Sequence, residues 1–251
     1  MAINKDSNGY VIGFAVVMVL VVGALLAFVA TALKPMQDAN VFNEKKQNIL
    51  QSIGFREITM KEAPNEFNTY VKERVLLNYD GEIAKDAKVY TSEDEIDPTD
   101  KKDPFNLDML KQYKANKKNY KSRLYPLYIC EKEGKKLIVA PVQGQGLWAG
   151  VWGYISLDAE GVIQGAVFDH KSETPGLGAE IKKDFFEERF IGKSIRKTNG
   201  EFGSVRVVKP GQELYDSQVD GISGGTFTSV GVDEMIQGTL VVYDKYLKNN
   251  K

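Results

Sequence analysis

The sequence is poor in the side chains that build most metal sites and hydrolytic triads. Cys130 is the only cysteine and His170 the only histidine among 251 residues. One cysteine cannot form an intrachain disulfide, and one histidine excludes a multi-histidine metal site. A Ser-His-Asp hydrolase would depend on His170, and the Gly-x-Ser-x-Gly turn of such enzymes is missing. We therefore expect His170 to be a hydrogen-bonded loop residue and not an acid–base catalyst.

An excess of charge of one sign is also missing. The 33 lysines and arginines balance 34 acidic residues, which leaves a formal net charge of −1. Because the chain has no basic stripe, binding to nucleic acid has no electrostatic support. A hydrophobic fraction of 43% over 251 residues fits one folded domain with appendages.

The longest uncharged segment lies near the N-terminus. Residues 11–33 hold no charge over 23 positions, enough to span a hydrocarbon core of about 30 Å as a helix. We predict a transmembrane helix at residues 10–33, after a short polar tail at residues 1–9. A cleaved signal peptide is the alternative, because Ala30-Thr31-Ala32 resembles a cleavage site. The length of the run and the single lysine before it favour a retained anchor.

Residues 34–122 are predicted to be a helical and charged linking region. Residues 38–53 read as a helix that ends at Gly54. Residues 65–77 read as a second helix, because their apolar side chains recur every four residues.

Residues 92–122 are dense in Asp, Glu and Lys and contain two prolines. Their carboxylates lack the spacing and the glycine of a calcium loop, so we expect a solvated loop or insertion here.

The remainder, residues 123–251, is predicted to be an α+β domain with an antiparallel sheet. Two apolar pairs of segments flank turn sequences and predict hairpins, at residues 124–139 and 152–168. Residues 179–190 are expected to be helical, and residues 204–208 to form a strand.

A glycine- and hydroxyl-rich turn at residues 220–229 leads into a predicted C-terminal helix. The turn reads Asp-Gly-Ile-Ser-Gly-Gly-Thr-Phe-Thr-Ser. A helix start presents unpaired backbone N–H groups and the positive end of the helix dipole, which together bind phosphate well. Because Gly224 and Gly225 have no Cβ, a phosphate could approach the backbone closely. An ordinary helix cap is the alternative interpretation.

The order Asp-x-x-Ser-Gly-Gly-Thr resembles the motif at which a flavin transferase joins FMN to a threonine through a phosphoester. The family usually has alanine where this chain has Gly225. The resemblance implies that Thr226 carries the flavin, with Thr228 as the nearby alternative. It also implies that Ser223, Gly224 and Gly225 lie at the phosphate.

A second loop, at residues 170–178, reads His-Lys-Ser-Glu-Thr-Pro-Gly-Leu-Gly. By itself it could be a structural turn between a strand and a helix. It resembles the loop that lies beside the flavin in the same FMN-bearing family. Thr174 and Leu177 are therefore candidates for contact with the flavin, and Gly176 and Gly178 permit the tight path of the loop.

The segment Gly-Gln-Gly-Leu-Trp at residues 144–148 resembles a third stretch of that family, one that approaches the flavin. It leaves Trp148 with two interpretations, a wall of the flavin pocket or a core aromatic.

Together with the apolar anchor, these motifs resemble the family of the anchored, FMN-bearing subunit of the sodium-translocating NADH:quinone reductase, over the whole chain. Two of the loops are shared with the FMN-bearing subunit of Rnf-type ferredoxin:NAD oxidoreductases. The resemblance implies an electron relay through one covalent FMN, in a complex of six subunits in the bacterial inner membrane. It further implies a flavin transferase as a partner during maturation, and a soluble domain in the periplasm.

Two other functions stay open at this point: a membrane-tethered adaptor without redox chemistry, and a signal-cleaved flavoprotein that diffuses freely.

Overall fold

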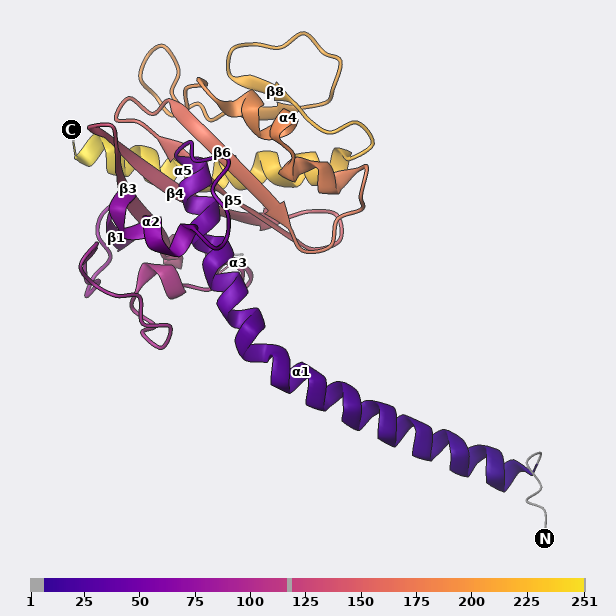
Figure 1. The fold of residues 1–251 in the computed structure, drawn as a ribbon. Coiled ribbons are helices and arrows are strands. Elements are labelled where there is room, and N and C mark those ends of the chain that lie inside the picture. Colours follow the sequence, from indigo (N-terminus) through magenta and orange to yellow (C-terminus); the bar gives the residue numbers. More distant parts are fainter. Residues whose placement is uncertain (1–6, 117–118, 251) are drawn as a thin grey trace. The chain divides into compact units, whose positions relative to one another are not determined.

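The computed structural model describes residues 7–116 and 119–250 (Figure 1). Contacts divide the chain into two compact units, residues 1–44 and residues 45–251. The α-helices are α1 (Asn8–Ser52), α2 (Ala63–Tyr70), α3 (Met109–Ala115), α4 (Asp184–Glu187) and α5 (Thr226–Asn249). Short 3-10 helices occur at η1 (Pro104–Asn106), η2 (Tyr120–Ser122), η3 (Gly178–Lys182) and η4 (Glu188–Phe190).

In the first unit, the apolar stretch of α1 is exposed along its length. Val11, Val19 and Phe28, for example, are 52%, 71% and 72% exposed. The helix is long enough and apolar enough to cross a membrane, and none of its most apolar stretch is buried. Because the core helix of a water-soluble domain would be covered, α1 fits a membrane-anchored subunit.

The second unit is built on a six-stranded sheet with the order β2-β1-β3-β4-β5-β6. Its strands are β1 (Val71–Leu77), β2 (Tyr90–Thr91), β3 (Tyr125–Lys132), β4 (Lys135–Gln145), β5 (Gly150–Leu157) and β6 (Ile163–His170), and every neighbouring pair is antiparallel. A separate parallel pair joins β7 (Arg206–Val208) to β8 (Gln218–Asp220). The predicted α+β class with an antiparallel sheet is confirmed.

Both predicted hairpins are confirmed, as β3–β4 and β5–β6. The first closes through Glu133 and Gly134, which both have positive φ, 53° and 73°. Two consecutive residues of that conformation match the right-handed twist of the flanking strands, so the turn sequence itself favours the hairpin.

Both faces of the sheet are covered, as Figure 1 shows. α5 packs on one face, and the Tyr243 hydroxyl donates to the Pro126 carbonyl oxygen at 2.7 Å. On the other face Tyr128 meets Phe105 edge-on with 6.4 Å between ring centroids, and Ser156 Oγ donates to the Ser52 carbonyl oxygen at 2.6 Å. Strands buried on both sides are apolar almost throughout, as β3 is.

The prediction of one helix over residues 65–77 is wrong in its second half. The helix α2 ends at Tyr70, and β1 follows at once, paired with β3. Val71 and Val75 are β-branched, and β1 is buried at Arg74–Leu77 because it lies inside the sheet. Tertiary pairing with β3 therefore overrides the four-residue spacing.

The charged segment at residues 92–122 is not only a solvated loop. Phe105 in η1 is 2% exposed and meets Phe67 of α2 with 5.6 Å between ring centroids. Within the described residues, no group of three or more His, Cys, Asp or Glu side chains could hold a metal ion. The segment is anchored to the fold by the Phe105 ring and by an ion pair between Asp103 and Arg74 of β1.

The helix predicted over residues 179–190 is divided into η3, α4 and η4. Lys183 has an extended backbone, with φ −98° and ψ 144°, and interrupts the helix. Beyond it Phe186 and Phe190 pack on Phe168 of β6, with ring centroids 5.7 and 5.1 Å away. Packing of these rings sets the path of the chain here.

Candidate functional site

Three loops meet at one end of the sheet: the β4–β5 turn at residues 146–149, the loop at residues 171–177, and the turn at residues 221–225 before α5. Strand register brings the first two together, because Val151 pairs with both Gly144 of β4 and His170 of β6. The β4–β5 turn is tight, since the Gly146 N–H donates to the Ala149 carbonyl oxygen at 2.8 Å.

Glycines bring the first turns of α5 against the same end of the sheet. A Cβ placed on Gly144 would lie 2.7 Å from Cβ of Met235, and one on Gly231 would collide with the Gln145 carbonyl oxygen. Real Cβ atoms do not tolerate such contacts, so both glycines are needed for this approach. The helix start therefore lies beside the β4–β5 turn.

One carboxylate, that of Glu173, joins its own loop to the β4–β5 turn and to the first turn of α5. Its Oε1 accepts hydrogen bonds from the backbone N–H groups of Trp148 and Ala149, at 3.0 and 3.4 Å. Its Oε2 accepts from Thr228 Oγ1 at 2.6 Å. The Glu173 side chain is 6% exposed, so these bonds are made away from solvent. The loop motif was predicted to lie beside the flavin, but no role was predicted for Glu173.

His170, the last residue of β6, makes a hydrogen bond to that loop, as we expected. Its Nδ1 accepts a hydrogen bond from the Glu173 N–H at 3.1 Å. His170 thus helps to hold the backbone that carries the buried carboxylate.

Thr226 opens α5 and is exposed. The N-cap residue is Gly225, no side chain caps this helix start, and the first turn holds no acidic residue. The first N–H groups of an α-helix have no carbonyl partner within the helix, and here no carboxylate competes for them. The arrangement fits a phosphate bound to the helix start, next to a free threonine hydroxyl.

The loop at residues 171–177 and the turn before α5 pack closely through glycine. Gly224 has φ +73°, and a Cβ there would lie 2.7 Å from Leu177 Cδ2. A Cβ on Gly225 would lie 3.1 Å from Cβ of Ile222, so glycine suits the tight path of the turn here. Leu177 thus packs directly against the turn before α5, the segment that is the candidate for binding phosphate.

The carboxylate of Asp220 does not cap α5 and bonds to a different segment. Its Oδ1 accepts from the Gly211 N–H at 3.3 Å. The backbone at this point is held by Arg189, whose Nη1 donates to the carbonyl oxygens of Asp220 and Gly221 at 2.7 and 3.3 Å. Arg189 was not predicted, because the contact joins segments about thirty positions apart.

Several large apolar side chains near the turn are exposed. Trp148 is 68% exposed, so the interpretation of Trp148 as a core aromatic is wrong. Leu177 is 42% and Phe227 70% exposed, and Thr174 is exposed as well. Side chains of this kind around an anion site suit a ligand with both a phosphate and a flat aromatic ring.

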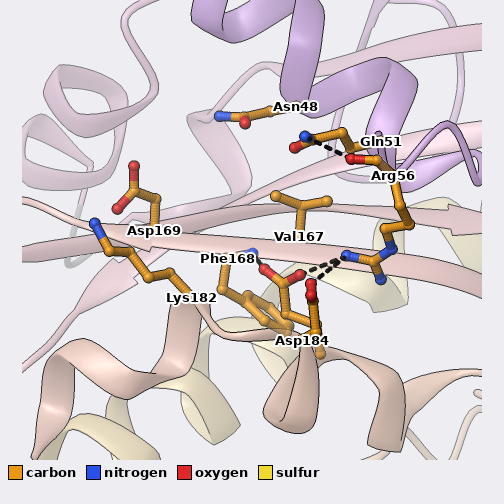
Figure 2. A pocket seen from close by; sticks show the side chains of 9 residues that line it. Asn48, Gln51, Arg56, Val167, Phe168, Asp169, Lys182 and Asp184 are labelled. Atoms are coloured by element: carbon orange, nitrogen blue, oxygen red, sulfur yellow. Dashed lines mark hydrogen bonds and ion pairs between the residues drawn. The ribbon is translucent and has the colours of Figure 1, made fainter. Parts of the chain in front are cut away.

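A polar cavity of about 220 Å³ lies elsewhere, on the outer side of β6 (Figure 2). None of its nine lining residues belongs to the three loops. At its wall Arg56 Nη1 contacts Glu187 Oε2 at 2.5 Å, and Glu187 Oε1 accepts from the Phe168 N–H at 2.6 Å. Burial raises the pKa of Glu187, and both partners oppose that shift. This pair satisfies polar groups at the edge strand.

The fold and the loops define an FMN-binding domain. Residues 146–241 match the family described as the FMN-binding domain, a range that contains all three loops.

Similar proteins define the family of this chain more narrowly than the domain does. It is 30% identical to the NqrC protein of the Na(+)-translocating NADH-quinone reductase of Pseudomonas aeruginosa, over 98% of this chain and 97% of that one. The crystal structure of the corresponding Na(+)-translocating NADH-quinone reductase protein from Parabacteroides distasonis has a TM-score of 0.70 and 40% identity, covering 86% of this chain and 96% of that one. NqrC from Shewanella oneidensis has a TM-score of 0.60 and 25% identity, covering 83% and 98%. The chain belongs to the NqrC family of Na(+)-translocating NADH-quinone reductase subunits.

Proposed function

We propose that this chain is the flavin-carrying subunit of a sodium-translocating NADH:quinone reductase, and that it relays electrons through one FMN held on Thr226. The observation that carries the proposal is the uncapped helix start with an exposed threonine where three loops meet. When bound, FMN supplies the redox chemistry, and the protein supplies its position and electrostatic environment.

Different residues would bind the phosphate and the ring of FMN. Backbone N–H groups from residues 223–228 and the start of α5 would hold the phosphate, with the exposed Ser223 hydroxyl beside them. Leu177, Thr174 and Trp148 would flank the ring. Gly176, with φ +75°, gives the loop its turn, and Gly178 lets it close over Thr228.

Attachment is a phosphoryl transfer to a hydroxyl. The bond from Thr226 Oγ1 to phosphorus forms, and a phosphorus–oxygen bond in the donor breaks. A phosphate monoester is a poor donor because hydroxide or water would have to leave, so the donor is a flavin dinucleotide with a pyrophosphate bond. Its nucleoside monophosphate leaves with the electron pair, and the hydroxyl proton passes to solvent or to a base of the flavin transferase.

We infer the cellular setting from the long apolar helix and from the resemblance to the family. We place residues 10–33 across the bacterial inner membrane as a single span, and the sheet domain that carries the flavin, with residues 123–251 as its FMN-binding part, in the periplasm. A covalent cofactor suits that compartment, because a lost flavin could not be recaptured there easily. Carbonate extraction should leave the protein in the membrane, and a reporter active only outside the cytoplasm should be active at the C-terminus.

Purification from the native membrane tests the function itself. We expect a yellow protein that elutes with the other five subunits and with NADH-dependent quinone reduction. A colourless protein would favour the membrane-tethered adaptor, and a yellow protein in the soluble fraction with a trimmed N-terminus would favour the diffusing flavoprotein.

A further inference from the structure

We propose that Glu173 is a positioning residue that selects Thr226 over Thr228 as the flavin acceptor and aligns the Trp148 turn with it. This inference rests on the proposed function, since it assumes that FMN is joined to this turn. The Glu173 carboxylate bonds to Thr228 and to the Trp148 turn, and so would act on Thr226 only through its neighbours.

The two threonines differ sharply in their surroundings. Thr228 is 1% exposed and donates its hydroxyl proton to Glu173 Oε2 at 2.6 Å. Thr226 is exposed. Side chains two positions apart on a helix point about 200° apart, so one hydroxyl faces solvent when the other faces the core.

The loop backbone closes over Thr228 as well. A Cβ on Gly178 would collide with Thr228 Oγ1 and would lie 2.7 Å from Glu173 Oε2. Of the two threonines, a transferase that brings a flavin dinucleotide to this turn therefore meets only Thr226.

The second oxygen of the carboxylate acts on the β4–β5 turn. Glu173 Oε1 accepts from the N–H groups of Trp148 and Ala149, and a Cβ on Gly146 would lie 2.5 Å from the same oxygen. The exposed Trp148 ring is thus carried on a backbone whose position depends on Glu173. Hydrogen bonds to a charged acceptor are stronger than those between neutral groups, and stronger still out of water.

Length and charge of the side chain can be separated by substitution. Glu173→Gln keeps the reach: its oxygen can accept from the Trp148 turn, and its amide can donate to Thr228 Oγ1. Glu173→Asp keeps the charge but is one methylene shorter, so it cannot reach both partners. Glu173→Ala removes both contacts. If Glu173 acts by positioning, the rate of flavin attachment should fall in the order Gln, Asp, Ala. If it acted as a base through its charge, the Asp variant would react faster than the Gln variant.

The experiment compares full-length wild type and the three variants, each produced with a flavin transferase in cells. Peptide mass mapping gives the modified threonine, timed sampling gives the attachment rate, and the visible spectrum of the bound flavin reports its surroundings. Thermal unfolding shows whether each variant folds.

We expect wild type to carry flavin on Thr226 alone, and Glu173→Gln to react within about twofold of it. Glu173→Asp and Glu173→Ala should react about tenfold more slowly or worse, the loss expected from one to two hydrogen bonds of this kind. Their remaining flavin should show a shifted visible spectrum. A purely structural role would lower thermal stability and leave the spectrum unchanged.

The inference is overturned if Glu173→Asp reacts as fast as Glu173→Gln or faster, or if all folded variants match wild type in rate and spectrum. If Glu173→Ala does not fold, the attachment rates of Glu173→Gln and Glu173→Asp still test the inference. Absence of covalent flavin from wild type would instead contradict the proposed function.

Discussion

Arg74 and Asp103 form an ion pair in the interior of the domain. Arg74 Nε lies 2.9 Å from each carboxylate oxygen of Asp103, and Nη2 lies 2.8 Å from Oδ2, with side chains 2% and 1% exposed. Asp103 also accepts from the Phe105 N–H at 2.9 Å and so begins η1. The pair joins the acidic segment to β1.

We expect Asp103→Ala to lower the free energy of unfolding by about 3–5 kcal/mol, because it leaves a buried guanidinium without its counter-ion. Urea unfolding of the purified protein measures this. Glu201→Ala is the control, since Lys197 and Glu201 lie 3.8 Å apart with both side chains more than half exposed, and it should change stability by less than about 1 kcal/mol. Equal effects of the two substitutions would contradict the assigned role of the buried pair.

Two glycines of α5 should respond in opposite ways to alanine. Gly231→Ala places a methyl group against the Gln145 carbonyl oxygen and should destabilise the domain by about 1–3 kcal/mol. Gly238→Ala has nothing within 4 Å of the new Cβ and should stabilise the helix by about 0.5–1 kcal/mol. Thermal unfolding tests the pair; a stabilising Gly231→Ala would mean that α5 does not approach β4 this closely.

Lys45 should make stability depend on pH above neutrality. Its ammonium donates to the Phe105 carbonyl oxygen, and burial lowers its pKa from an ordinary value of about 10.5 to about 8, opposed by Asp103 and Asp108. Between these two values the unfolded chain binds a proton that the folded chain does not, so the free energy of unfolding should rise with pH. Lys45→Met should remove that rise. An unchanged slope in the variant would show that Lys45 is not its source.

Leu177 should influence a flavin bound at the turn. Because Leu177 lies on Gly224 and is 42% exposed, Leu177→Lys should fold normally. Its charge would favour the more negative reduced flavin and raise the midpoint potential by on the order of tens of millivolts. Leu177→Met is the control and should keep the potential. A spectroscopic redox titration that finds equal potentials would remove Leu177 from the flavin environment.

Local patterns predicted much of this molecule. The apolar run, both hairpins and the start of α5 follow from periodicity, turn chemistry and helix-start residues that act over a few positions. The three loop motifs were also visible, because each is a short continuous segment.

Contacts between distant segments could not be predicted from those patterns. β1 looked helical because its pairing with β3, about fifty residues later, has no local signal. Glu173 looked like one more loop residue, since its partners come from the β4–β5 turn and from α5. The exposure of Trp148 likewise depends on where the β4–β5 turn lies in the folded domain.

The acceptor threonine is the most direct test of the whole account. Protein made in the native host would be digested, and its peptides mapped by mass in wild type, Thr226→Ala and Thr228→Val. We predict FMN on Thr226 in wild type and in Thr228→Val, and no covalent flavin in a folded Thr226→Ala, whose exposed side chain should change stability by less than about 0.5 kcal/mol. Covalent flavin retained in Thr226→Ala, or absent from wild type, would contradict the account.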